Sequence, residues 1–259
     1  MTGVLTGGSR EPSGPRARRE ASSRAPRLQL LGEFVVAGPN GDRVRIPYAS
    51  QRVVALAALQ RRPLLRRLVA TRIWPHLAVP SALASLRTAI SRMHAAHPLL
   101  LTTTPELITL APQLQVDLVE HEARALEVIR GGELCAALEL PTDIFTTPLL
   151  AEWDDDWVNV ERQRVQELFL HALEASALRL AGDGHVALAL HAAYAVLGTD
   201  SLRESAARTV IELHLREGNR AQAARIFLDF RERLRLALNV APSAELYALV
   251  EGVVRSRGG

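Results

Sequence analysis

Residues 80–98 read PSALASLRTAISRMHAAHP, and this stretch decides the fold of the first half of the chain. Pro80 and Ser81 favour a helix start and Pro98 cannot continue a helix, so the sequence predicts a helix over 81–96. The large apolar residues of this segment recur at the spacing of a single helical stripe, which is expected to pack onto two preceding helices. They are Leu83, Leu86, Ile90 and Met93.

The remaining faces of this helix hold arginine, histidine and small hydroxyl residues, and they hold no acid, although the chain has 28 acidic residues. Small hydroxyl side chains let a helix enter a DNA groove closely, and arginine takes guanine O6 and N7 with two hydrogen bonds or clamps phosphates. The segment therefore predicts a DNA-reading helix. Arg87 and Arg92 are the main predicted contacts, and Ser85, Thr88 and Ser91 line the groove face. An ordinary basic surface is the alternative interpretation.

The segments around this helix complete a pattern of strands, three helices and a hairpin. LQLLGEFVVAG (28–38) and RVRIPY (43–48) are strand-like runs separated by a turn signal, Pro39-Asn40-Gly41-Asp42. A first helix is expected from Ser50, taken as its N-cap, and a second over about 65–74. A β-hairpin is expected from 99–104 and 107–112. This order predicts a winged helix with a small sheet in front of it, over residues 28–114.

Contacts that position a protein on the phosphate backbone usually come from helix ends and flanking arginines. Arg52, in the first turn of the first helix, and Arg72, at the end of the second, are the predicted positioning contacts. Both are equally consistent with surface solubility. A further basic cluster around the first interhelical turn either touches the DNA backbone or forms a solvated loop; it consists of Arg61, Arg62, Arg66 and Arg67.

From residue 117 onward the strand signal disappears and a helical domain over 115–259 is expected. Gly184, Ala187 and Ala189 recur 34 residues later as Gly218, Ala221 and Ala223. An offset of 34 residues is the tetratricopeptide spacing, in which stacked helix pairs form grooves for protein surfaces. Helices are expected over 117–130, 132–140, 152–181, 184–197, 201–216, 220–237 and 243–255.

Charge divides along the chain in the same way. Residues 1–27 hold 6 Arg and 2 acids, residues 28–114 hold 10 Arg and 3 acids, and residues 115–259 hold 15 Arg and 23 acids. The net charges are therefore +4, +7 and −8. This asymmetry indicates that one part of the chain faces a polyanion. Residues 1–27 are rich in Gly, Pro, Ser and Arg and are predicted to be a disordered tail.

Several classes of chemistry find no support in the sequence. The chain has no lysine, which excludes the phosphate-binding loop that needs one and also Schiff-base catalysis. His94 and His97 lack further ligands nearby, so no metal is expected. Asp154-Asp155-Asp156, between Trp153 and Trp157, is interpreted as an acidic helix start with the two tryptophans packed inward. No catalytic motif or cofactor motif is found, so an enzyme is not expected.

The residues above resemble the Streptomyces antibiotic regulatory proteins, which carry a winged-helix domain and a bacterial transcriptional activation domain. In the first half the resemblance lies in LQLLGEF, SQRVVALAAL, RRLVATRIWP and ALASLRTAISRMHAA. In the second half it lies in VDLVEHEARAL, PLLAEWDDDWVNVERQRVQEL and REGNRAQAARIFLDFRERLRLALNVAPSAELYALV. The resemblance covers roughly residues 28–255, and the order and spacing of the segments are more specific than any single motif.

The resemblance implies an activator that binds direct repeats in double-stranded promoter DNA and recruits the RNA polymerase holoenzyme, usually at antibiotic gene clusters. A homodimer on the direct repeats is one arrangement that fits such binding. Two features depart from the family pattern: the wing turn Pro105-Glu106-Leu107 and the segment 61–65. A carboxylate at the wing tip is repelled by phosphates, which argues against the usual minor-groove contact there.

Two other functions remain open on the sequence alone. A helical-repeat adaptor could use the winged helix to bind protein, and a repressor could use the same DNA contacts. The single cysteine, Cys135, cannot form an internal disulfide, which indicates a reducing compartment. No apolar run is long enough for a membrane span and no signal peptide is recognised. A cytoplasmic, nucleoid-associated protein is therefore expected.

Overall fold

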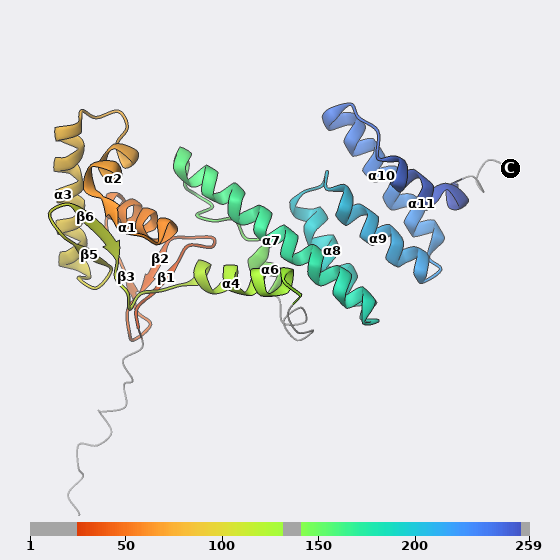
Figure 1. Ribbon diagram of the computed structural model, residues 1–259, viewed down its shortest axis with the longest axis horizontal. Helices are drawn as coiled ribbons and strands as arrows, with labels where there is room; N and C mark the ends of the chain where they lie inside the picture. The colour runs from red at the N-terminus through yellow and green to blue at the C-terminus, as the bar shows by residue number, and fades with distance from the viewer. Residues whose placement is uncertain (1–24, 132–140, 255–259) are drawn as a thin grey trace, which may run out of the picture.

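The computed structural model describes residues 25–131 and 141–254, in two parts that follow one another along the molecule (Figure 1). The predicted helix over 132–140 lies outside the described residues, as does the predicted tail up to residue 24. Arg27, which the sequence assigned to the tail, instead begins the first strand. No helix in the described ranges is long and apolar enough to cross a bilayer.

The first part opens with a small sheet. Strands β1 (Arg27–Gln29), β2 (Val35–Ala37) and β3 (Arg43–Val44) pair antiparallel in chain order. A late strand, β7 (Gln115–Val116), joins the free side of β1 in parallel, which gives the order β3-β2-β1-β7. The sequence did not predict β7, because two residues show no alternation. This strand ties the start of the second part to the sheet of the first.

The expected three helices and hairpin follow. They are α1 (Tyr48–Gln60), α2 (Arg66–Ile73), α3 (Val79–Ala96), β5 (Leu101–Thr103) and β6 (Leu107–Leu110). A further short strand, β4 (Leu64–Leu65), pairs antiparallel with β6, so the hairpin becomes a three-stranded wing sheet of order β4-β6-β5. This is a winged helix preceded by a small sheet, as the sequence predicted.

The apolar stripe of α3 is buried as predicted for Leu86, Ile90 and Met93, while Leu83 is partly buried against the same core. Helix α1 is buried almost all round, because the other helices and the wing sheet surround it. The predicted capping role of Ser50 is wrong. Helix α1 already begins after Pro47, and the buried Ser50 hydroxyl donates a hydrogen bond of 2.7 Å to the Ala89 carbonyl of α3.

The second part is helical and extends away from the winged helix as a row of packed helices (Figure 1). Neighbours from α7 to α11 pack pairwise along the chain, in the manner of tetratricopeptide repeats. Gly184 and Gly218 both adopt positive φ after a helix, and Ala189 and Ala223 are both fully buried, so the 34-residue repeat corresponds to equivalent structural positions. The helices are α4 (Asp117–Ile129), α6 (Thr142–Phe145), α7 (Asp156–Gly182), α8 (Val186–Thr199), α9 (Glu204–Arg216), α10 (Arg220–Leu238) and α11 (Ala244–Val254).

Helix α7 begins four residues later than predicted, because the segment before it is held as a loop. The guanidinium of Arg162, on α7, donates to the carbonyl oxygens of Leu149, Leu150 and Trp153 at 2.7–2.8 Å. Trp153 and Trp157 are both buried, as predicted. These carbonyl groups accept hydrogen bonds from Arg162 and not from a helix backbone, so Asp156 is the first residue of α7.

The two parts are joined by polar contacts that are partly buried. The carboxylate of Asp117, on α4, accepts hydrogen bonds from the backbone N–H groups of Leu30 and Leu31 at 2.9 and 3.1 Å, and a third from Leu118 at 2.7 Å. The pKa of this carboxyl is raised above its ordinary value by burial, and the three N–H donors oppose only part of that rise. The joint thus relies on backbone donors to hold a charge that burial disfavours.

A second ionic contact across the joint centres on Glu122, whose side chain is 6% exposed. Its carboxylate forms ion pairs with Arg61, at the end of α1, and with Arg164 on α7, the latter at 2.9 Å. At the other end of α1, Trp153 stacks on Phe34 with ring centroids 5.7 Å apart and meets Tyr48 edge-on at 5.3 Å. The winged helix therefore touches the helical part through a buried carboxylate and an aromatic cluster.

We predict that Glu122→Ala lowers the free energy of unfolding by about 2 kcal/mol, because it leaves Arg61 and Arg164 facing each other without their shared counter-ion. Urea unfolding followed by circular dichroism measures this change. Glu127→Ala is the matched control, since Glu127 is exposed on the same helix. Equal stability of the two variants would show that the carboxylate does not hold the joint.

Candidate nucleic-acid interface

Helix α3 lies on the outer side of the winged helix, at the end of the molecule away from α10 and α11 (Figure 1). Its exposed face carries four of the residues predicted from the sequence: Arg87, Thr88, Ser91 and Arg92. Ser85 is half-buried at the edge of that face. The structure therefore brings five of the seven predicted contact residues onto one helix face.

These side chains form two short rows, because residues four apart are neighbours on a helix surface. Arg87 stands above Ser91, and Thr88 stands above Arg92. Neither arginine has a salt-bridge partner among the described residues, so both charges face solvent. Thr88 donates its hydroxyl proton to the Ala84 carbonyl at 3.1 Å, which leaves its methyl group and oxygen lone pairs facing outward.

Charge around this face is strongly one-sided. Residues 48–110, from α1 to the end of β6, hold 8 arginines and one acidic residue, Glu106. Two of the arginines are neutralised by the helical part, Arg52 by Asp155 and Arg61 by Glu122. The other six form no ion pair within the described part of the chain; they are Arg62, Arg66, Arg67, Arg72, Arg87 and Arg92.

The wing stands beside the first half of α3. Its turn is built by Thr104, whose hydroxyl oxygen accepts hydrogen bonds from the backbone N–H groups of Glu106 and Leu107 at 3.3 and 3.0 Å. The guanidinium of Arg66 donates to the Thr104 carbonyl oxygen at 3.1 Å. Glu106 itself is exposed at the tip. The backbone N–H of Arg66 also donates to the Glu106 carbonyl oxygen at 2.9 Å, so the wing presents one arginine and one carboxylate side by side at its turn.

A hollow with a volume of about 520 Å³ separates the wing from α3. Leu83 and Arg87 line it from α3, and Arg66 lines it together with the wing residues Thr103, Thr104 and Pro105. Two unpaired guanidinium groups across an open hollow suit a phosphodiester strand, because arginine binds phosphate oxygens through parallel N–H donors.

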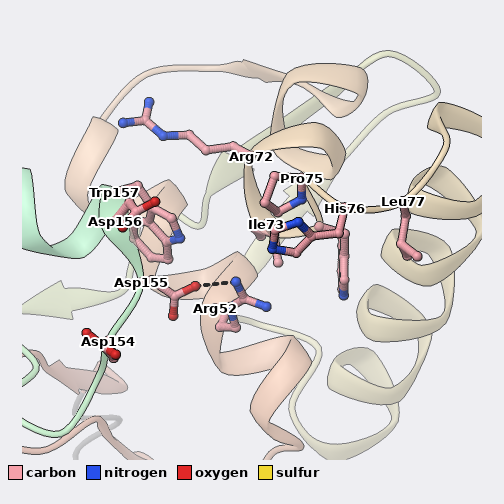
Figure 2. Close-up of a pocket in the computed structure, with 11 residues that line it drawn as sticks. Arg52, Arg72, Ile73, Pro75, His76, Leu77, Asp154, Asp155, Asp156 and Trp157 are labelled. Atoms are coloured by element: carbon pink, nitrogen blue, oxygen red, sulfur yellow. Dashed lines mark hydrogen bonds and ion pairs between the residues drawn. The ribbon is translucent and has the colours of Figure 1, made fainter.

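Arg52 and Arg72 lie elsewhere. Both line a cleft at the joint, where Arg52 forms an ion pair with Asp155 and the two side chains are 17% and 11% exposed (Figure 2). Arg72 is exposed at the end of α2. Asp155 comes from a segment 103 residues further along the chain, and no local pattern signals such a pairing. Arg52 and Arg72 are therefore left out of the surface that α3 and the wing form.

Arg66 is the residue whose place the sequence could not define. The sequence put it in a basic cluster at an interhelical turn, whereas strand β4 carries it to the wing. The only available signal was the apolar pair Leu64-Leu65, which is too short to show a strand period.

Among the described residues, no group of three or more His, Cys, Asp or Glu side chains is placed to hold a metal ion.

Comparison with solved structures gives a relative of the whole architecture. Mycobacterium tuberculosis EmbR, in complex with a low-affinity phosphopeptide, is similar over 90% of this chain with a TM-score of 0.72 and 19% sequence identity. The chain covers 65% of the EmbR chain. At this identity the similarity establishes the fold, which is a winged helix followed by a tetratricopeptide-like helical domain.

Comparison with protein families is more specific for the second half. No curated protein matches the sequence. The model of the bacterial transcriptional activator domain matches residues 115–254, which begin at β7 and end with α11. This match spans more than half of the chain, so the chain belongs to the bacterial transcriptional activator domain family.

Proposed function

We propose that the protein is a sequence-specific transcriptional activator that reads promoter DNA with α3 and contacts RNA polymerase through its helical domain. The observation that carries the proposal is the exposed face of α3. It offers two unpaired arginines among small hydroxyl side chains, on the third helix of a winged helix. The division into a DNA-binding part (28–114) and an activation part (115–259) belongs to the proposal.

The dimensions and chemistry of this face suit the major groove, which is about 12 Å wide and admits one α-helix. Arg87 and Arg92 are about 1.4 helical turns apart, so each reaches a different base step. Ser91 and Thr88 are small enough to let the helix backbone approach the base edges. The hollow between Arg66 and Arg87 then receives the flanking phosphodiester strand.

The helical domain is the proposed contact for the polymerase. It is acidic overall, and its stacked helix pairs leave exposed surfaces of the kind that bind proteins. Its family membership supports an activating role over repression or a pure adaptor function. Binding to direct repeats, as monomers or as a homodimer, and control of an antibiotic gene cluster are parts of the proposal that rest on the resemblance to the Streptomyces regulators.

We predict that the double variant Arg87→Ala/Arg92→Ala binds the promoter fragment upstream of its own gene on the order of 100-fold more weakly. Each arginine that pairs with a guanine contributes about 1–3 kcal/mol of discrimination. A mobility shift at one stated salt concentration measures the change. Arg225→Ala/Arg233→Ala on α10 removes the same charge from exposed positions and is the matched control. Equal affinities of the two double variants would contradict the assignment of α3.

Arg66 is expected to act on the DNA backbone rather than on base identity. We predict that Arg66→Met weakens binding to promoter and random duplexes by the same factor. It should also reduce the slope of log affinity against log salt by about 1, because one phosphate contact is lost. Fluorescence anisotropy over a salt series measures both quantities. A loss confined to the promoter sequence would place Arg66 on a base instead. A wild-type slope near zero on random duplex would favour the adaptor function.

Glu106 is expected to weaken DNA binding in the natural protein. We predict that Glu106→Gln raises affinity about 3-fold at low salt and that the gain falls as salt is added, since it removes repulsion between a carboxylate and nearby phosphates. The same anisotropy series measures this, with Glu127→Gln on α4 as a control for the general loss of one negative charge. Unchanged affinity in Glu106→Gln would mean that the wing tip stays away from the duplex.

A further inference from the structure

A cleft with a volume of about 410 Å³ lies at the joint between the two parts of the molecule (Figure 2). One wall is the end of α2 and the turn after it, residues 72–77, together with Arg52 of α1. The other wall is the segment 154–157 at the start of α7. This volume lies in the range of clefts that hold small organic ligands. The residues that line the cleft lie outside α3 and the wing, so they take no part in the proposed DNA contacts.

The lining combines an apolar floor with polar groups, which is the usual composition of a small-molecule site. Ile73 and Trp157 are buried, and Trp74 is partly buried against the core. Leu77 lines the cleft and is 43% exposed. Together these residues offer an apolar surface that an occupant would cover.

One buried polar group in the lining has no partner. Trp157 is 6% exposed, and its indole N–H makes no hydrogen bond. In Figure 2 the indole nitrogen faces the interior of the cleft. The Nε–H of Arg52 is likewise buried without an acceptor, although the same guanidinium pairs with Asp155. A buried donor without an acceptor destabilises the folded state, and a ligand oxygen at this place would satisfy it.

The charges at the rim favour a cation. Asp155 is occupied by Arg52 and by the Tyr48 hydroxyl, which donates to it at 3.4 Å. Asp154 and Asp156 flank it, are exposed, and form no ion pair within the described residues. Arg72 supplies the opposing charge, and its side chain runs along the rim in Figure 2. The two carboxylates therefore outnumber the one guanidinium that is not paired.

We propose that this cleft binds a small organic molecule with a protonated amine, a hydrogen-bond acceptor and an apolar ring. The amine is held by Asp154 and Asp156, the acceptor by the indole N–H of Trp157, and the ring by Ile73, Trp74 and Leu77. Contact with the buried N–H requires a small rotation of the indole or of Arg52. Because the walls come from both parts of the chain, an occupant stabilises the joint by mass action.

L-Phenylalaninamide carries all three groups and is the probe for a test on the full-length protein. Two of the three tryptophans line the cleft, so selective tryptophan fluorescence reports binding directly and needs no DNA. We expect a saturable change with a Kd on the order of 1 mM, typical of a fragment of this size. Phenylacetamide, which lacks the amine, should bind about fivefold more weakly or worse.

Two double variants locate the site. Asp154→Asn/Asp156→Asn should weaken binding of the probe about fivefold, and circular dichroism without probe should show that the variant is folded. Asp183→Asn/Asp229→Asn removes the same charge from exposed positions outside the cleft and should bind as the natural chain does. The proposal is overturned by a response that stays linear to about 20 mM, or by equal binding of the probe to both double variants. Equal binding of the two amides would likewise remove the role of the carboxylates.

Discussion

The arrangement of the molecule depends on a shared carboxylate. Glu122 is buried between the winged helix and the helical domain and takes an arginine from each, Arg61 and Arg164. A buried charge of this kind is tolerated only where its partners are fixed. Arg61 lies at the end of α1, where its backbone is left-handed, and Arg164 forms a second ion pair with Glu161 at 2.8 Å. Together with Asp117 and the aromatic cluster, this contact sets where α1, and therefore α3, lies relative to α7.

The basic residues of the winged helix have two different roles, which depend on whether they lie at the joint. Arg52 and Arg61 are neutralised by acids of the helical domain, so they stabilise the contact between the two parts. Arg66, Arg87 and Arg92 lie on the other side of α1 and keep their charges free. The bulk asymmetry in charge, +7 against −8 for the two parts, thus has two physical uses. Some of the opposite charges hold the parts together, and the remainder of the positive charge faces outward around α3.

Local patterns predicted the parts of the fold that depend on local periodicity. The stripe of α3 and the 34-residue repeat of Gly184 and Gly218 both correspond to observed elements, because burial of one face repeats at helical spacing. Features that depend on distant partners were not predictable. Ser50 was misread as a helix cap because its acceptor, the Ala89 carbonyl, lies in another helix. Strands β4 and β7 are two residues long and exist only because β6 and β1 lie beside them.

The candidate site also has a predictable part and an unpredictable part. The α3 residues were predictable as one face because a single helix carries them. The ion pair of Arg52 with Asp155, and the place of Arg66 beside the wing, depend on residues that are distant in the sequence. What the residues of that face do follows from which groove α3 enters. Methylation protection of the promoter fragment by dimethyl sulfate measures this, since it reports guanine N7 in the major groove and adenine N3 in the minor groove. With α3 in the major groove, guanine N7 positions are expected to be protected when the protein is bound. Binding with unprotected guanines, or with only adenine N3 protected, would contradict it.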